Sequence, residues 1–380
     1  MHKHKTTIVD LFCGCGGFSL GAELAGLHSL VAVDIDPTLQ SAYRRNFPQS
    51  KTVQVDVADL DATSWRLFLG KQKVDGIIGG PPCQGFSRIG KRKKDDPRND
   101  MIGHYFRQVD ILRPKFFVME NVEGLLDEKN IHRLSEGIDR ISAHYQVLPP
   151  FIVNAADFGA ATKRRRVVVI GYTQDDVDPF GQDLFNKNPN TITATVNDAI
   201  SDLPAPIPET KNKFDLGWTK YKKMRPDHIL SDYAIRLRQP PPNGLGCPES
   251  IKMHAAGFVS GMFSTKHTLE VAARYAGTSQ GKCDKISKSL RLAWEGQCPT
   301  LRAGTGSEKG AFQAVRPIHP EDGRVITVRE AARMQGFPDW FVFHPTKWHS
   351  FRMIGNSVSP IVSYGLFSKI LLQMSAARAA

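Results

Sequence analysis

The sequence of 380 residues predicts an α/β protein with a doubly wound, mostly parallel sheet, and two observations lead to this prediction. As far as His144, short apolar runs alternate with amphipathic segments, which is typical of strands separated by helices that cover both faces of a sheet. Two later runs, 146–153 and 167–172, have no long helix between them and predict an antiparallel hairpin at one sheet edge.

The individual elements follow from the length and the periodicity of the apolar runs. Short apolar runs predict strands over residues 7–12, 30–34, 53–55, 74–79 and 116–120. Amphipathic segments between them predict helices over residues 18–25, 38–46, 101–113 and 131–144. Near the C-terminus, a short helix at 328–335 is expected to end at Gly336-Phe337-Pro338, because proline cannot continue a helix. An apolar helix at 358–374 is long enough to pack on the sheet.

The amino-acid composition of the chain changes after Tyr172. Residues 173–325 are rich in Pro, Gly, Asn and Lys, and runs such as Pro204-Ala-Pro206-Ile-Pro208 and Pro240-Pro241-Pro242 break regular structure. We interpret this part as a smaller, irregular second domain with a binding role. A decorated loop insertion is the alternative.

Charge and cysteine content narrow the class of protein. The formal net charge of +12, with basic clusters at Lys91–Lys94 and Lys163–Arg166, indicates a polyanionic partner, although a basic enzyme without one would also fit. No apolar run has transmembrane length, and the N-terminus continues directly into the first strand, so neither a membrane span nor a signal peptide is expected. The six cysteines match no zinc-binding pattern, so we expect reduced thiols and no metal.

A cysteine and a carboxylate follow two of the predicted strands. Cys83 lies in Pro81–Ser87, and Glu120 ends the run that begins at Phe116. Because ligands bind at the carboxyl edge of an open parallel sheet, the two side chains are expected near one site. A lone cysteine is usually buried and inert, but the basic run Arg88–Lys94 favours a thiolate. The pair predicts a nucleophile that adds to a flat ring and an acid that neutralises the resulting charge.

Three further groups predict a nucleoside-bearing cofactor. The segment Asp10–Ser19 contains a glycine turn between a strand and a helix, where the backbone can approach a ligand closely. Asp34 and Asp56 end the next two strands, where a carboxylate can bind a ribose diol, although each could instead cap a helix.

In an alternating strand, Arg164 and Arg166 share one face, so one of them could point into the site while Arg165 points away.

These residues resemble the DNA (cytosine-5) methyltransferases of bacterial restriction–modification systems. The resemblance covers residues 6–172 and 324–372 and includes six motifs in the family's order. The motifs are Asp10–Gly17, Pro81–Ser87, Glu120–Val122, Lys163–Arg166, Arg329–Pro338 and Gly355–Val358. The G-x-G-x-x-G pattern of a nicotinamide oxidoreductase is absent.

The resemblance implies a S-adenosylmethionine (SAM)-dependent methyltransferase fold and a role for each motif. Cys83, Glu120, Arg164 and Arg166 are the implied catalytic residues. The implied SAM-binding residues are Phe12, Gly14, Gly16, Gly17, Phe18, Asp34, Ile35, Asp56, Val57, Pro82, Asn356, Ser357 and Val358. The implied DNA-binding residues are Gln84, Ser87, Arg88, Lys91, Arg92, Thr300 and Arg302.

The resemblance also implies a discontinuous catalytic domain, residues 1–178 and 326–380, and a target-recognition domain, residues 179–325. The expected protein is a monomeric, cytoplasmic modification enzyme that acts on double-stranded DNA in the bacterial nucleoid. It departs from the family pattern at Thr162, where a Gln is usual, and at Asp34, where a Glu is commoner. An RNA (tRNA) cytosine-5 methyltransferase is the alternative, and Gly85 and the long second domain argue against it. A non-catalytic binding module would be expected to lose Cys83 or Glu120.

Overall fold

The computed structural model describes residues 5–82, 101–221, 229–303 and 316–377, and it is built around one eight-stranded sheet. The strands of this sheet are β1 (Thr7–Leu11), β2 (His28–Asp34), β3 (Lys51–Gln54), β4 (Gly76–Gly79), β5 (Phe116–Asn121), β6 (Gln146–Val147), β7 (Phe151–Asn154) and β9 (Arg165–Tyr172). Their order is β3-β2-β1-β4-β5-β9-β6, with β7 also paired to β9. Strands β1 to β5 are parallel, and β9 is antiparallel to β5, β6 and β7. The predicted doubly wound, mostly parallel α/β fold is confirmed.

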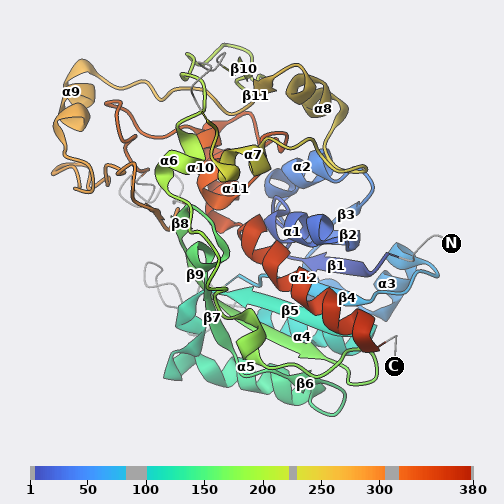
Figure 1. Cartoon of the computed structure of the whole chain (residues 1–380). Helices are drawn as coiled ribbons and strands as arrows, with labels where there is room; N and C mark the ends of the chain where they lie inside the picture. The colour runs from blue at the N-terminus through green and yellow to red at the C-terminus, as the bar shows by residue number, and fades with distance from the viewer. Residues whose placement is uncertain (1–4, 83–100, 222–228, 304–315, 378–380) are drawn as a thin grey trace.

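Helices pack on both faces of the sheet (Figure 1). One face contacts α1 (Gly17–Ala25), α2 (Pro37–Asn46) and α12 (Pro360–Ala377), and the other contacts α3 (Ala62–Leu69), α4 (Met101–Leu112) and α5 (Glu128–Ile141). Successive strand side chains point to opposite faces. Ile8 and Ile78 therefore pack in the first core, and Val9 and Ile77 in the second.

The hairpin at the edge of the sheet differs from its prediction in two ways. The expected strand 146–153 is divided into β6 and β7, because Pro149 and Pro150 have no N–H to donate to a ladder. Its partner β9 lies inside the sheet, between β5 and the two short strands.

Helices α3 and α11 were not predicted from the sequence, nor were the helices α6 to α9 within residues 173–325. Helix α3 begins at a capping box formed by Asp61 and Ser64, and α11 spans Lys347–Asn356. Helix α10 (Val328–Gln335) has the predicted bounds and ends at Gly336, whose φ of 86° is in the left-handed region.

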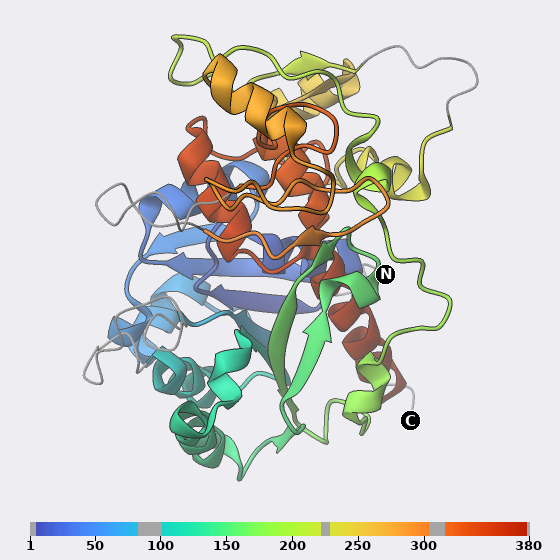
Figure 2. The ribbon, with the colours of Figure 1, turned by 90° about the vertical axis from the view of Figure 1, so that its left-hand side faces the viewer.

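The segment after Tyr172 forms short elements that are separate from the large sheet. They are η5 (Gln182–Phe185), α6 (Val196–Ile200), β10 (Thr219–Lys220), α7 (Asp232–Leu237), α8 (Pro248–Ala255), β11 (Phe258–Val259), α9 (Leu269–Gly277) and β12 (Cys298–Pro299). Figure 2 shows most of this region above the sheet, with α9 at its upper side. Strand β10 pairs with β11, and β12 pairs with β8 (Thr162–Lys163), which directly precedes β9. Among the described helices, none combines the length and the apolar character that a bilayer span requires.

A cluster of buried charged side chains links α10 to the segment that follows α6. Arg333 and Asp339 are both fully buried, with 2.6 Å between Arg333 Nε and Asp339 Oδ1. Arg333 Nη1 also lies 3.1 Å from Oδ1 of Asp202, which follows α6. Burial opposes ionisation of Asp339, but Arg333 beside it keeps the pKa of the carboxyl below its usual value. Moving α6 away from α10 would leave buried charges without their partners. These ion pairs therefore fix the position of α6 against α10.

We predict that Arg333→Met lowers the free energy of unfolding by about 3–5 kcal/mol, because the buried carboxylate of Asp339 loses its closest cation and Asp202 keeps only Arg238. Chemical denaturation measures this loss. The matched control is Arg45→Met, which removes an exposed ion pair 3.1 Å from Glu249 and should cost less than about 1 kcal/mol. Equal losses in the two variants would contradict the account of the buried cluster.

Candidate active site

The turn after β4 lies beside the acid at the end of β5. The parallel register pairs Gly79 with Met119, which places Gly80 next to Glu120. A Cβ on Gly80 would lie 3.2 Å from Oε2 of Glu120. Asn121 Nδ2 donates to the carbonyl oxygen of Pro81 at 3.2 Å. The acid motif is thus bonded to the turn that leads into Cys83, which itself lies outside the described residues.

Glu120 forms a close ion pair with Arg166 of the neighbouring strand β9. The distance between Arg166 Nε and Glu120 Oε1 is 2.8 Å, and the two side chains are 17% and 12% exposed. The Nε–H bond of Arg166 does not point toward Oε1 of Glu120, so the contact is an ion pair and not a hydrogen bond. Oε1 has no hydrogen-bond partner among the described residues. A buried carboxylate oxygen in this state can bind a polar group of a substrate.

The three consecutive arginines have different environments. Arg166 reaches Glu120, whereas Arg165 Nε lies 2.6 Å from Glu123 Oε1 at the surface. Arg164 is buried and donates to the carbonyl oxygens of Leu301 and Gly355. Burial lowers the pKa of Arg164 well below its usual value. The two arginines of the predicted face therefore have different contacts, because the guanidinium of Arg164 bonds to backbone and that of Arg166 pairs with Glu120.

One small hollow brings four of the motifs together. It lies between β7, β9 and α12 and is lined by Phe18, Glu120, Arg164, Arg166 and Val358, with further apolar side chains. These residues come from the glycine turn, the acid motif, the basic motif and the last motif. Figure 1 shows how α12 returns from the C-terminal part of the chain to pack beside α1.

The glycine turn after β1 has the backbone geometry of a ligand loop. Phe12, Gly14 and Gly16 have positive φ values of 60°, 54° and 95°. The N–H of Gly14 donates to Asp34 Oδ2 at 2.8 Å, and the N–H of Asp36 donates to Asp34 Oδ1 at 2.8 Å. Asp34 is buried at the end of β2, and burial raises its pKa.

The last motif lies against the start of α1. A Cβ on Gly17 would be 1.9 Å from Ser357 Oγ and 2.5 Å from Val358 O, so only glycine permits this approach. Ser363 Oγ donates to the carbonyl oxygen of Phe18 at 2.5 Å. Asn356 is exposed beside them. Segments from the two ends of the chain therefore form one surface at the glycine turn.

Asp56 begins the short helix η1 (Val57–Asp59), and its Oδ1 accepts from the N–H of Ala58 at 2.9 Å. Arg107 of α4 donates to the carbonyl oxygens of Val57, Ala58 and Leu60 at 2.6–3.1 Å. Sequence reasoning did not predict this role, because an arginine within an amphipathic helix is usually solvated.

The groups at this edge of the sheet fit a cofactor that carries a nucleoside. Ile35 follows Asp34 and is 62% exposed, and Phe12 is partly buried, so two apolar side chains accompany the carboxylates. Carboxylates suit a ribose diol and an amino group, and the apolar side chains suit a flat base. The donor set therefore fits SAM. Pro82 and Val57 border the same strand ends.

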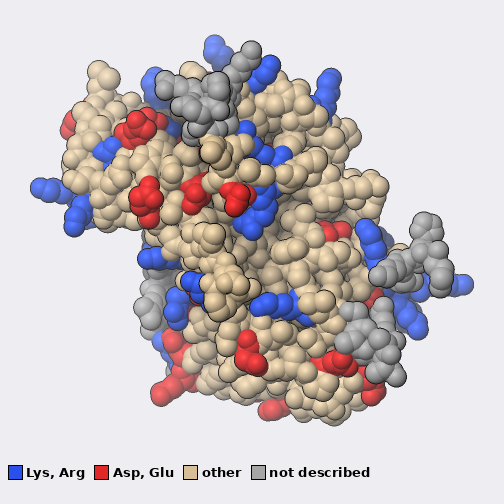
Figure 3. Space-filling model, in the orientation of Figure 1, with Lys and Arg blue, Asp and Glu red and all other residues tan. Residues whose placement is uncertain are grey.

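Only two of the expected DNA-binding residues are described. Thr300 Oγ1 donates to the carbonyl oxygen of Lys163 at 2.8 Å, and Arg302 is exposed nearby. The others, Gln84, Ser87, Arg88, Lys91 and Arg92, lie outside the described residues. In Figure 3, blue Lys and Arg side chains lie over the upper part and the middle of the molecule, whereas the lower edge shows more red.

Three of the described cysteines are buried in a way that opposes formation of a thiolate. Cys13, Cys15 and Cys298 are buried, and burial raises the pKa of Cys15 to about 12 and that of Cys13 well above its usual value. Cys247 and Cys283 lie in the region after Tyr172 and form no disulfide. Within the described ranges, no group of three or more His, Cys, Asp or Glu side chains has a geometry that could bind a metal ion.

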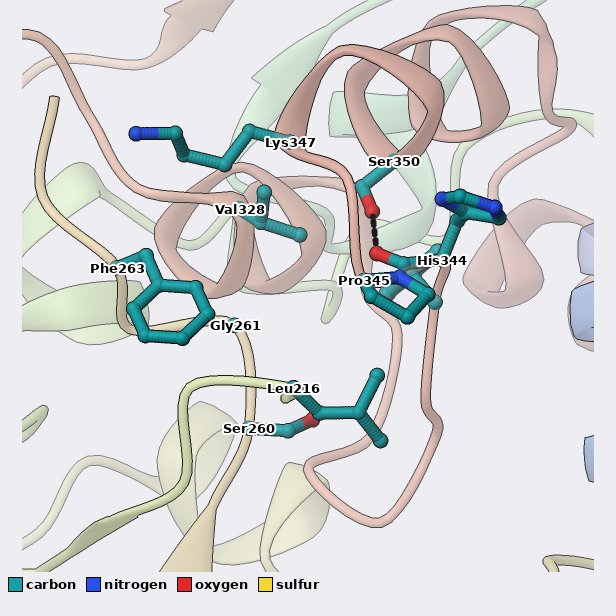
Figure 4. A pocket seen from close by; sticks show the side chains of 10 residues that line it. Leu216, Ser260, Gly261, Phe263, Val328, His344, Pro345, Lys347 and Ser350 are labelled. Carbon is teal, nitrogen blue, oxygen red and sulfur yellow. Dashed lines mark hydrogen bonds between the residues drawn. The ribbon is translucent and has the colours of Figure 1, made fainter. Parts of the chain in front are cut away.

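A second hollow lies apart from these motifs, between α11 and the segments around Leu216 and Phe263 (Figure 4). Ser350 Oγ donates to the carbonyl oxygen of His344 at its side. Its lining contains none of the predicted catalytic or cofactor-binding residues.

Comparisons with known proteins identify the family of the chain. A model of the C-5 cytosine-specific DNA methylase family matches residues 6–372. The chain is 42% identical over 371 residues to the Type II methyltransferase M.XorII of Xanthomonas oryzae pv. oryzae, covering 96% of this chain and 84% of that relative. It is 31% identical over 398 residues to the Type II methyltransferase M.DdeI of Desulfomicrobium norvegicum, covering 96% and 88%.

Solved structures show the same relationship. A protein from an E. coli prophage, described as a DNA modification methyltransferase, has a TM-score of 0.85 at 40% identity and covers 98% of this chain and 100% of its own. The Dnmt2 methyltransferase of S. pombe has a TM-score of 0.62 at 15% identity, which shows a shared fold only. By its family match, its relatives and its fold, the chain belongs to the C-5 cytosine-specific DNA methylases, enzymes that take the methyl group from SAM.

Proposed function

We propose that this enzyme methylates C5 of a flipped cytosine in one DNA sequence through a covalent bond between Cys83 and C6. The observation that carries the proposal is the arrangement at the strand ends. Asn121 bonds to Pro81 in the turn before Cys83, and Glu120 beside that turn is paired with Arg166. This arrangement supports a nucleophile and an acid that act on one ring.

The chemistry follows from the low reactivity of C5. When the Cys83 thiolate adds to C6, electron density moves into the ring, and a proton from Glu120 to N3 neutralises it. The ring carbon C5 then has enamine character. Arg166, 2.8 Å from Glu120, stabilises the carboxylate that remains after this proton transfer and can also donate to O2 of the base.

Bound SAM supplies an electrophilic methyl group at this edge of the sheet. Asp34 is assigned to its ribose hydroxyls and Asp56 to its adenine amino group, next to the turn that Arg107 contacts. Loss of the C5 proton to a base, with release of the Cys83 sulfur, completes the reaction.

The proposal also assigns catalysis and DNA recognition to different segments of the chain. Residues 1–178 and 326–380 bind SAM and carry out the reaction, and residues 179–325 read the DNA. A base inside a duplex cannot be attacked on its face, so the target cytosine has to leave the stack. We further propose that the enzyme is a monomer of the bacterial cytosol that protects host DNA in a restriction–modification system, as the Type II names of its relatives suggest.

Glu120→Gln is expected to lower the single-turnover methylation rate by about 100-fold or more, because an amide cannot transfer a proton to N3. Its affinity for target DNA should change little. Bisulfite sequencing of DNA from expressing cells first identifies the target, and labelled SAM then gives the rate. The matched control is Glu123→Gln, three residues away, which also faces an arginine but lies at the surface. Equal losses in rate and in binding would indicate that Glu120 has a structural role.

Exchange of residues 179–325 is expected to transfer sequence specificity. In a chimera, this segment replaces the corresponding segment of a family member with another target, and bisulfite sequencing maps the methylated sites. The chimera should methylate the target of the present enzyme, since few side chains outside the segment are expected to read bases. An active chimera that keeps its original target would contradict this division.

A further inference from the structure

A short ladder joins the end of the recognition region to the catalytic strand. Strands β8 and β12 pair in parallel, with Cys298 opposite Thr162 and Pro299 opposite Lys163. The N–H of Cys298 also donates to the carbonyl oxygen of Ala161 at 2.9 Å. We call residues 161–164, residues 298–303 and Gly355 the recognition junction.

Two threonine hydroxyls cross the recognition junction in opposite directions. Thr162 is fully buried, and its Oγ1 donates to Cys298 O at 3.0 Å, with Pro299 O at 3.4 Å as a second acceptor. Thr300 Oγ1 donates in the other direction, to Lys163 O at 2.8 Å. The residue that departs from the family pattern therefore has a specific pair of partners in this chain.

Arg164 adds a third segment to the junction. Its Nη1 donates to Leu301 O at 3.3 Å, and its Nη2 donates to Gly355 O at 3.0 Å. Gly355 is the first residue of the last motif, and a Cβ there would lie 2.4 Å from the backbone of Arg302 and Ala303. One buried guanidinium thus contacts the recognition region and the segment that leads to the cofactor loop.

The junction lies directly before the catalytic ion pair. Arg164 is two residues from Arg166, which contacts Glu120. Its backbone is bonded to β7 and η4 (Ala155–Phe158), because Arg164 N–H donates to Asn154 Oδ1 and Ala155 N–H donates to Arg164 O. A shift of residues 298–301 therefore also displaces the start of β9. Strand β9 cannot move independently of Glu120, because its Arg166 contacts that carboxylate.

We propose that Thr162 and Arg164 are positioning residues that fix the recognition region relative to the Glu120–Arg166 pair. The inference rests on the proposed function, in which one part of the chain reads DNA and another reacts. The flipped base has to reach Glu120 from DNA that residues 179–325 hold, and a misplacement of about 1 Å can cost about 100-fold in rate. Binding to DNA depends on many phosphate contacts and is much less sensitive to the junction.

The test is a pair of substitutions at Thr162. Thr162→Val keeps the shape and removes the hydroxyl, and Thr162→Ser keeps the hydroxyl. With saturating SAM and a short duplex carrying the mapped site, Thr162→Val should lower the single-turnover rate about tenfold, as expected for one lost buried hydrogen bond. Thr162→Ser should stay within about twofold of the wild type, and the Kd for the duplex should stay within about twofold for both variants.

Three results would overturn the proposal. They are an unchanged rate in Thr162→Val, an equal loss in both variants, and a loss of duplex affinity as large as the loss of rate. If Thr162→Val does not fold, Thr162→Cys, whose S–H is a weaker donor, takes its place, and the same comparison of rate with Kd decides. A wild-type enzyme that methylates no cytosine in DNA would instead contradict the proposed function, and the inference with it.

Discussion

The register of β5 between two neighbours is the constraint on which the active site depends. On one side, the parallel pairing with β4 brings the turn at Gly80 and Pro81 beside Glu120. On the other, the antiparallel pairing with β9 brings Arg166 to the same carboxylate. A shift by one residue would turn Glu120 toward the opposite face of the sheet. A reversed β9 in an otherwise parallel sheet is therefore part of the proposed catalytic arrangement.

The two parts of the chain are joined by buried polar contacts. Arg333 joins α10 to Asp202 beyond α6, and Arg164 joins β9 to the carbonyl oxygen of Leu301. Apolar contacts tolerate small displacements, whereas buried charges require defined partners and geometry. These contacts suit an enzyme that has to transfer the position of a DNA site to a reacting carbon atom.

The sequence predicts the strands and helices that have strong local patterns. It does not predict features that depend on contacts between residues far apart in the chain. The parallel strands and α10 follow from apolar runs and a terminating glycine, and ordered motifs reveal the family. Helix α3 has only eight residues and begins at a capping box, so its apolar pattern covers little more than two turns. The carbonyl partners of Arg164 lie 137 and 191 residues away in the chain, which no local pattern encodes. The sequence predicts a catalytic role for Arg164, and its contacts with backbone support the positioning role that we propose for it.

The covalent bond at Cys83 is the central claim, and 5-fluorocytosine tests it most directly. A fluorine at C5 cannot leave as a proton, so a target duplex containing this base, incubated with SAM, should trap the enzyme in a denaturation-resistant adduct. Peptide mapping should place the adduct on Cys83, since burial raises the pKa of Cys13 and Cys15. Cys83→Ser should give no adduct and no methylation. An adduct on another cysteine, or full methylation by Cys83→Ser, would contradict the account.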